Sequence, residues 1–167
     1  MPQLNYYILF ITAAFPIILG AVYFNPKVMG KAWLSVAGLT ADEVLGGSMV
    51  RKLLLTYLFG LFMSYVLFLF SVHQSAMYQL FLHEEDLFKS GSELNNYVAS
   101  YMAEYGDRHR TFGHGVLHGM ELCLLMGLGM IGITALNEQR PMKYMWIHVI
   151  FWVLCGGLMG GVLCAFV

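Results

Sequence analysis

Four long stretches of this 167-residue chain carry almost no charge, and they constrain its fold more than any other feature. They span residues 6–24, 53–72, 112–136 and 145–167. At 1.5 Å per residue, a helix of such length crosses the roughly 30 Å hydrocarbon core of a bilayer. Charged residues make up only 11% of the chain, against the roughly 25% usual in soluble domains. The sequence therefore predicts an all-α fold, a four-transmembrane-helix bundle that forms one integral membrane domain over residues 1–167.

The connecting segments differ in their basic residues, which indicates an orientation. With four spans, both termini and the outer segment 73–111 share one side, and the loops 25–52 and 137–144 share the other. The two loops hold six basic residues, against three in the outer segment. Because basic residues mark the cytoplasmic face, we expect both termini and the outer segment to face outward. The net charge of −1 gives no indication of a nucleic-acid partner.

Short interfacial amphipathic helices are predicted outside the spans. Thr40 and Glu43 form a capping-box pattern, so a helix is expected to begin there. A second capped helix is expected after Ser92, with one apolar and aromatic face, ending at Gly106. That face comprises Leu94, Tyr97, Val98, Tyr101, Met102 and Tyr105. This helix either lies on the membrane surface or packs over the mouth of the bundle. Pro16, in the middle of the first span, predicts a kink.

The segments that follow the first span resemble the opening signature of a bacterial membrane-protein family, domain of unknown function 1761. The resemblance rests on Gly20-Ala21-Val22-Tyr23-Phe24, Met29-Gly30-Lys31-Ala32-Trp33, Gly38-Leu39-Thr40, and the acids Asp42 and Glu43. The chain departs from the family at residues 22–24, where members often carry Trp-Tyr, and its outer segment is longer than usual. The resemblance implies a helical protein of the bacterial cytoplasmic membrane and implies no activity.

The third stretch holds the side chains of this chain that are best suited to binding a ligand or transferring a proton. His114, His118 and Glu121 share one helical face, since successive residues are about 100° apart. Glu121 lies about 13.5 Å along the helix from Phe112, near the bilayer midplane. Ionisable groups at such depth cost about 2.5–3.5 kcal/mol to insert, so they are functional candidates by default.

Three interpretations of this face remain open. In one, its side chains only form hydrogen bonds within the bundle, to partners such as Thr12, Tyr57, Ser64 or Tyr65. In another, His114 and His118 bind a divalent transition metal, because imidazoles four residues apart on a helix can share one ion. Glu121, His73 or His109 would complete that metal site. In the third, the same groups line a pathway for protons or for a ligand.

Glycines recur four residues apart in the third and fourth spans. The pairs are Gly115 with Gly119, Gly156 with Gly160, and Gly157 with Gly161. Such pairs let helices approach closely in lipid, where van der Waals contact drives association. They either pack helices within the bundle, or form a homodimer or a docking face for another protein's helix.

These features support three hypotheses about function. The leading one is a structural or accessory membrane protein that associates with itself or docks to a membrane complex. The second is a small transporter or channel subunit whose polar pathway is lined by Glu121, His114 and His118. The third is an intramembrane metal-binding protein, with a divalent transition metal at the same three residues as its sole cofactor. The sequence carries no motif of a named enzyme class, which favours a non-enzymatic role.

Overall fold

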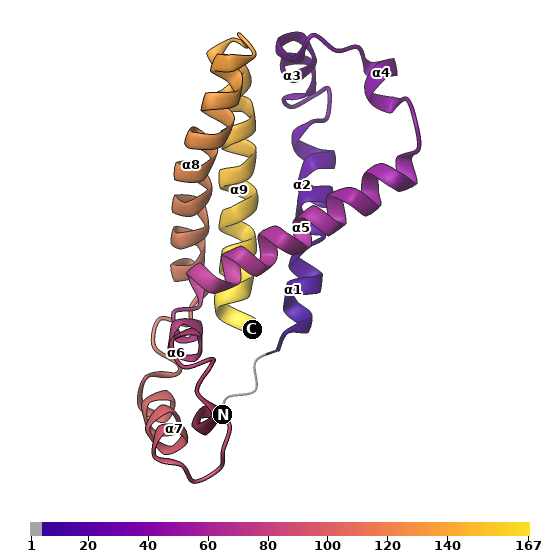
Figure 1. Cartoon of the computed structure of the whole chain (residues 1–167). Helices are drawn as coiled ribbons and strands as arrows, with labels where there is room; N and C mark the ends of the chain where they lie inside the picture. The colour runs from indigo at the N-terminus through magenta and orange to yellow at the C-terminus, as the bar shows by residue number, and fades with distance from the viewer. Residues whose placement is uncertain (1–4) are drawn as a thin grey trace.

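The computed structural model describes residues 5–167, and every regular element in that range is helical. The elements are α1 (Tyr7–Thr12), α2 (Phe15–Tyr23), α3 (Gly30–Ala37), α4 (Ala41–Leu45), α5 (Met49–Ser71), α6 (Gln74–Leu80), the 3₁₀ turn η1 (Glu85–Leu87), α7 (Glu93–Tyr105), α8 (Phe112–Asn137) and α9 (Met142–Phe166). Figure 1 shows how they are arranged. The all-α fold predicted from the sequence is confirmed.

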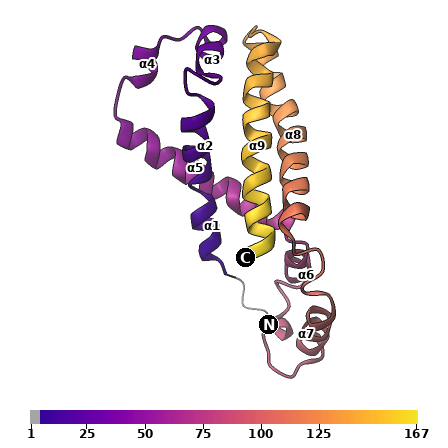
Figure 2. The same cartoon turned by 180° about the vertical axis from the view of Figure 1, so that it is seen from behind.

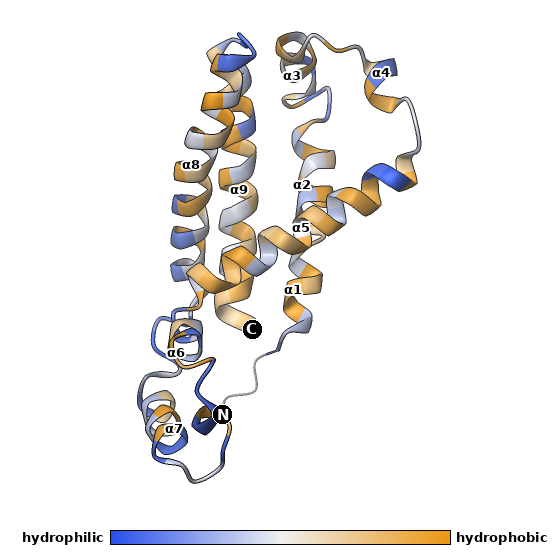
Figure 3. Ribbon diagram, viewed as in Figure 1, coloured by the Kyte–Doolittle hydropathy of each residue, from blue (hydrophilic) through white to orange (hydrophobic). Residues whose placement is uncertain are grey.

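Three of these helices, α5, α8 and α9, are long and apolar enough to cross a membrane. Apolar residues dominate all three, as Figure 3 shows. α5 begins at Met49, earlier than predicted, because Ser48 caps it by accepting a hydrogen bond from the Arg51 backbone nitrogen at 3.3 Å. α9 likewise begins at Met142, directly after Pro141, whose extended backbone ends the preceding turn.

The first hydrophobic stretch forms two consecutive helices, α1 and α2, instead of one. Pro16 lies in the first turn of α2, where its missing N–H costs no helical hydrogen bond. The kink predicted at Pro16 is therefore present as a break between Thr12 and Phe15. Together α1 and α2 cover Tyr7–Tyr23, a shorter apolar length than that of each of the three long helices.

α5 crosses α1 and α2 at this break, as both views of the ribbon show (Figures 1 and 2). The crossing is close because Gly60 of α5 packs on the backbone of Ala13, where a Cβ atom would collide with the carbonyl oxygen. Next to it, the Thr12 and Ser64 hydroxyls share a buried hydrogen bond of 2.7 Å. This buried hydroxyl pair ties α1 to α5.

α8 and α9 form an antiparallel hairpin, and the predicted glycine pairs lie inside it. Gly115 and Gly119 pack against the backbone of Gly160 and Gly156, where added Cβ atoms would collide with carbonyl oxygens. The other two glycines of α9 also face α8: Gly157 lies against Met120, and Gly161 against Phe112. All three glycine pairs therefore serve packing within this chain.

The outer segment folds into a small unit of its own, formed by α6, η1 and α7. Leu87, Val98 and Met102 are its buried core, with Met77 and Tyr78 packed around them. Ser92 caps α7 as predicted, accepting a hydrogen bond from the Asn95 backbone nitrogen at 3.1 Å, and the Thr40–Glu43 capping box opens α4. Leu94, Val98 and Met102 of the apolar stripe are thus packed within this unit, whereas Tyr97 and Tyr101 are exposed.

One end of the molecule holds the start of α1, the outer segment and the end of α9. The Asn5 amide donates to the Phe166 carbonyl at 3.2 Å, and Arg110 donates to the Cys164 carbonyl at 2.7 Å. The opposite end holds α3, α4 and the α8–α9 turn, where Arg140 donates to the Ala37 carbonyl at 2.9 Å. Asn5 and the end of α9 therefore lie beside the outer segment.

Candidate metal centre

Three histidines lie close together: one follows the end of α5, directly before α6, and the other two are in the first turns of α8. Val72 ends α5, and His73 follows at the N-cap position of α6. His114 and His118 lie in the first two turns of α8. α8 starts at this point because the Thr111 side chain caps it, accepting a hydrogen bond from the His114 backbone nitrogen at 3.3 Å. The outer segment connects α5 to α8 and brings the end of α5 next to the start of α8.

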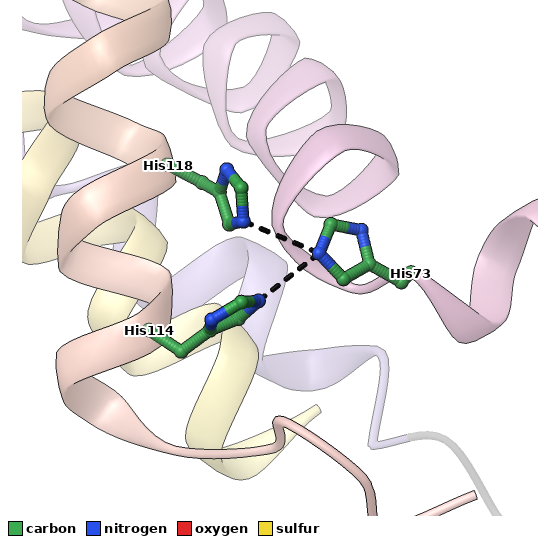
Figure 4. Close-up of side chains that lie close together, drawn as sticks. All are labelled: His73, His114 and His118. Atoms are coloured by element: carbon green, nitrogen blue, oxygen red, sulfur yellow. Dashed lines mark hydrogen bonds between the residues drawn. The ribbon is translucent and has the colours of Figure 1, made fainter. Parts of the chain in front are cut away.

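The three imidazoles converge through their Nε2 atoms, as Figure 4 shows. His73 Nε2 lies 3.2 Å from His118 Nε2 and 3.0 Å from His114 Nε2. One ring nitrogen from each histidine lies within 4.8 Å of the other two. Each pair of the three rings meets edge to face.

This spacing suits a metal ion. Zinc–imidazole bonds of about 2.0–2.1 Å place neighbouring nitrogens of a tetrahedral site roughly 3.3–3.4 Å apart. The two separations at His73 are slightly shorter than that value, and the third pair, His114 and His118, lies within 4.8 Å. Three imidazoles leave one tetrahedral position open for water or another ligand. Without an ion, neutral His73 carries at most one proton on Nε2, so it donates to one neighbour at most.

The protonation of His73 also favours coordination. Partial burial lowers the pKa of His73 below the ordinary histidine value, and the nearby His118 and His109 lower it further. An imidazole must be neutral to bind a metal through a ring nitrogen. The neighbours that would repel a protonated His73 therefore keep it in the form that binds metal.

The packing of the α8 glycines on α9 determines the direction in which the His114 and His118 side chains point. Gly115 and Gly119 lie against α9, and each is the next residue after a histidine of the cluster. Because successive helical positions are about 100° apart, His114 and His118 then project away from α9, toward His73. The packing of α8 against α9 therefore determines the positions of both imidazoles.

Glu121, which the sequence grouped with the metal ligands, shares the helical face of the two histidines but is not one of the three residues whose nitrogens converge. Its Oε2 atom lies 3.7 Å from Nδ1 of His118, the ring nitrogen that does not face the shared centre. Its side chain is 60% exposed in the isolated chain. Glu121 is thus placed to orient a ligand, as carboxylates beside metal-binding histidines commonly do.

His109, the other residue expected to complete a metal site, stacks on His114 with ring centroids 5.0 Å apart. It is not among the three residues whose ring nitrogens converge. Its backbone has a φ of 63°, a left-handed conformation that is uncommon for a residue with a side chain. His109 therefore lies beside the cluster, on the path by which the chain enters α8.

The polar residues expected to bond this face lie elsewhere. Thr12 and Ser64 bond each other, and the Tyr57 hydroxyl donates to the Phe10 carbonyl at 3.0 Å. Tyr65 is exposed. The prediction of these partners is therefore wrong, because α5 turns its Tyr57–Ser64 portion toward α1 and brings only its far end to α8.

Residues 7–164 match the family model described as "Protein of unknown function (DUF1761)". The chain belongs to this family. The match covers the histidine cluster, both glycine helices and the whole outer segment. No curated protein and no solved structure matches the chain. Membership of DUF1761 confirms the resemblance carried by residues 20–43 and extends it to almost the full length.

Sequence reasoning named His73 only as one of several residues to complete a site, whereas the structure places it between the other two. Its position at the end of a predicted span, on the same side as the start of the third, was the available signal. Sequence reasoning missed Gln74 altogether. Its amide donates to the carbonyls of Tyr105 at 3.3 Å and Arg108 at 2.8 Å, and so fixes the end of α7 beside His73.

Proposed function

We propose that this DUF1761 protein binds a divalent transition metal ion through His73, His114 and His118. The proposal rests on the convergence of three Nε2 atoms. His73 is 41 residues from His114 and 45 residues from His118 in the chain. A ligand set of three imidazoles without thiolates suits zinc, copper(II), nickel or iron(II). When bound, such an ion acts as a Lewis acid toward water or an oxyanion at its open position.

The proposed setting is the bacterial cytoplasmic membrane, crossed four times, with the histidines at the outer end of the bundle. The basic residues support this orientation. Six of them lie in segments 25–52 and 137–144, which include α3, α4 and the α8–α9 turn at the end opposite the histidines: Lys27, Lys31, Arg51, Lys52, Arg140 and Lys143. A metal site at the outer end is open to ions from the periplasmic side, since His73 is exposed.

The experiment is metal analysis of the full chain purified in mild detergent. After incubation with zinc and removal of excess ion, we expect one equivalent of zinc per chain. Cobalt(II) in its place is expected to give the visible absorption bands of a nitrogen-rich, four- or five-coordinate site. A preparation that holds no stoichiometric zinc, cobalt, copper, nickel or iron would contradict the proposal.

Metal affinity is expected to depend on pH, because protons compete for the same imidazoles. Affinity should fall as the pH drops below about 6.5, the ordinary histidine pKa. Because burial lowers the pKa of His73, this ligand stays neutral to a lower pH than an ordinary histidine. Because the pKa of His73 is lower in the folded chain than in the unfolded chain, the contribution of His73 to folding stability is present above the ordinary histidine pKa and is lost on acidification. Zinc titrations between about pH 5 and 8 measure the dependence.

Replacing Glu121 by glutamine is expected to weaken zinc binding by about 10- to 100-fold. The carboxylate stands beside Nδ1 of His118 and would hold its N–H, which fixes the ring and raises its basicity. Competition with a chelator of known affinity measures the change. Glu84→Gln, an exposed acid of the outer segment, is the matched control. A loss as large as that from removing a histidine would instead make Glu121 a ligand.

Exposure of Glu121 also supports a second candidate function, an accessory protein that docks to another membrane chain. A carboxylate that faces lipid on a spanning helix is costly, so a neighbouring helix would be expected to cover it. The glycine faces of α8 and α9 are already occupied within the chain, which leaves the outer face of α8 for this contact. Cross-linking from Glu121→Cys in native membranes tests it, and a chain that stays monomeric and without partners contradicts it.

A further inference from the structure

Beside the histidine cluster, a cavity of about 500 Å³ lies between α6 and the end of α7. His73 belongs to its wall as well as to the metal centre. The rest of the polar wall comes from Gln74, Tyr101, Tyr105, Arg108 and His109. A volume of this size matches that of small-molecule pockets.

The charge that lines the cavity is positive. Arg108 supplies a permanent positive charge, and no aspartate or glutamate lines the cavity in the part of the chain that the structure describes. The exposed guanidinium lies over the Tyr105 ring, at 4.9 Å from the ring centre. A guanidinium presents paired N–H donors that suit the oxygens of a carboxylate or phosphate.

The cavity is also preformed. Gln74 is only 8% exposed and donates to the carbonyls of both Tyr105 and Arg108, so α6 and the end of α7 are tied together across its base. The lining also includes the apolar side chains of Ala76, Met77 and Leu80. A ligand that satisfies both the polar and the apolar lining has an anionic head and an apolar body.

We propose that this cavity binds an oxyanion, carboxylate or phosphate ester, carried on an apolar body, with the oxyanion paired to Arg108. The proposal goes beyond metal binding and does not depend on it, because the cavity and Arg108 are present without an ion. A metal held by His73 would add positive charge to the same wall and strengthen the binding. The ligand can be a free solute or the head group of an anionic lipid, since both offer this chemistry at the membrane surface.

Calorimetric titration of the metal-free full chain in neutral detergent tests the proposal, with benzoate and phenyl phosphate as probes. We expect saturable binding of both, weaker binding of acetate, and none of the uncharged benzyl alcohol. Arg108→Gln should weaken benzoate binding by about tenfold or more, since it removes a hydrogen bond to a charged group. Arg108→Lys should restore part of the affinity. Arg51→Gln, the same change at the opposite end of the molecule, should leave it unaltered.

Equal benzoate binding by the wild type and Arg108→Gln, or equal binding of benzyl alcohol, would overturn the proposal. Monodispersity and helical content of each variant confirm that it is folded, and the Arg108→Lys variant keeps the test valid if glutamine unfolds the outer segment. Nanodiscs distinguish the two sources of the oxyanion: competition with benzoate by added phosphatidylglycerol assigns the cavity to a lipid head group, and its absence assigns it to a free solute. Zinc content, measured on the same samples, reports separately on the metal proposal.

Discussion

The double substitution His114→Ala/His118→Ala is expected to abolish stoichiometric zinc binding. Both side chains place Nε2 about 3 Å from that of His73, and a lone His73 cannot retain an ion against solvent. Structural zinc sites with four ligands bind with about 10–16 kcal/mol, so each ligand contributes roughly 3 kcal/mol or about 100-fold in affinity. Metal analysis of the purified variant, and loss of the cobalt bands, measure the effect.

His83→Ala is the control for this prediction. His83 is an exposed histidine of the same outer segment and has no contact with the cluster. Its replacement removes one imidazole from the chain without touching the converging nitrogens, so zinc content is expected to stay at one equivalent. Retention of wild-type zinc by the double variant would show that the histidines only bond one another. The single substitution His73→Ala should cost as much as either single change on α8.

Gly119→Leu is expected to destabilise the protein by about 3 kcal/mol or more, the upper part of the range for overpacked sites. A Cβ atom at Gly119 would collide with the Gly156 carbonyl oxygen and lie 3.2 Å from the Gly157 Cα atom, all of which is helix backbone. Backbone cannot yield as a flexible side chain can, so α8 and α9 must separate. Thermal unfolding in detergent, followed by near-ultraviolet circular dichroism, measures the loss.

Gly129→Leu provides a matched control on the same helix. A Cβ atom there meets no other atom within 4 Å, so the side chain extends into open space. Glycine is a poorer helix former than alanine by roughly 0.8–1.0 kcal/mol, and leucine ranks just below alanine, so this variant should be as stable as the wild type or slightly more stable. Equal stability of the two variants would mean that α8 and α9 do not pack through their glycines.

The two predictions are coupled through α8. Because Gly119 follows His118 directly, a helix displaced from α9 also moves both imidazoles relative to His73. Gly119→Leu should therefore lower zinc affinity even in molecules that remain folded, whereas Gly129→Leu should leave it unchanged. Helix packing on one face and ligand placement on the adjacent face are two results of the same contact.

Local features of the sequence determined the helices. Uncharged runs of about 20 residues gave α5, α8 and α9, and capping residues such as Thr40 and Ser92 set where short helices begin. The shared face of His114 and His118 also followed from the sequence, since the helical period fixes which side chains lie together. These features depend only on residues within a few turns of one another.

Only the tertiary structure decided what each face meets. The sequence left the glycine pairs open between another chain and this one, and the crossing of α8 and α9 places them together. It grouped Glu121 with the ligands, whereas the position of α6 puts His73 at the centre and leaves Glu121 beside His118. The physical reason is range: periodicity orients side chains around one helix axis, but the angle and register between helices are set by packing of residues far apart in the chain.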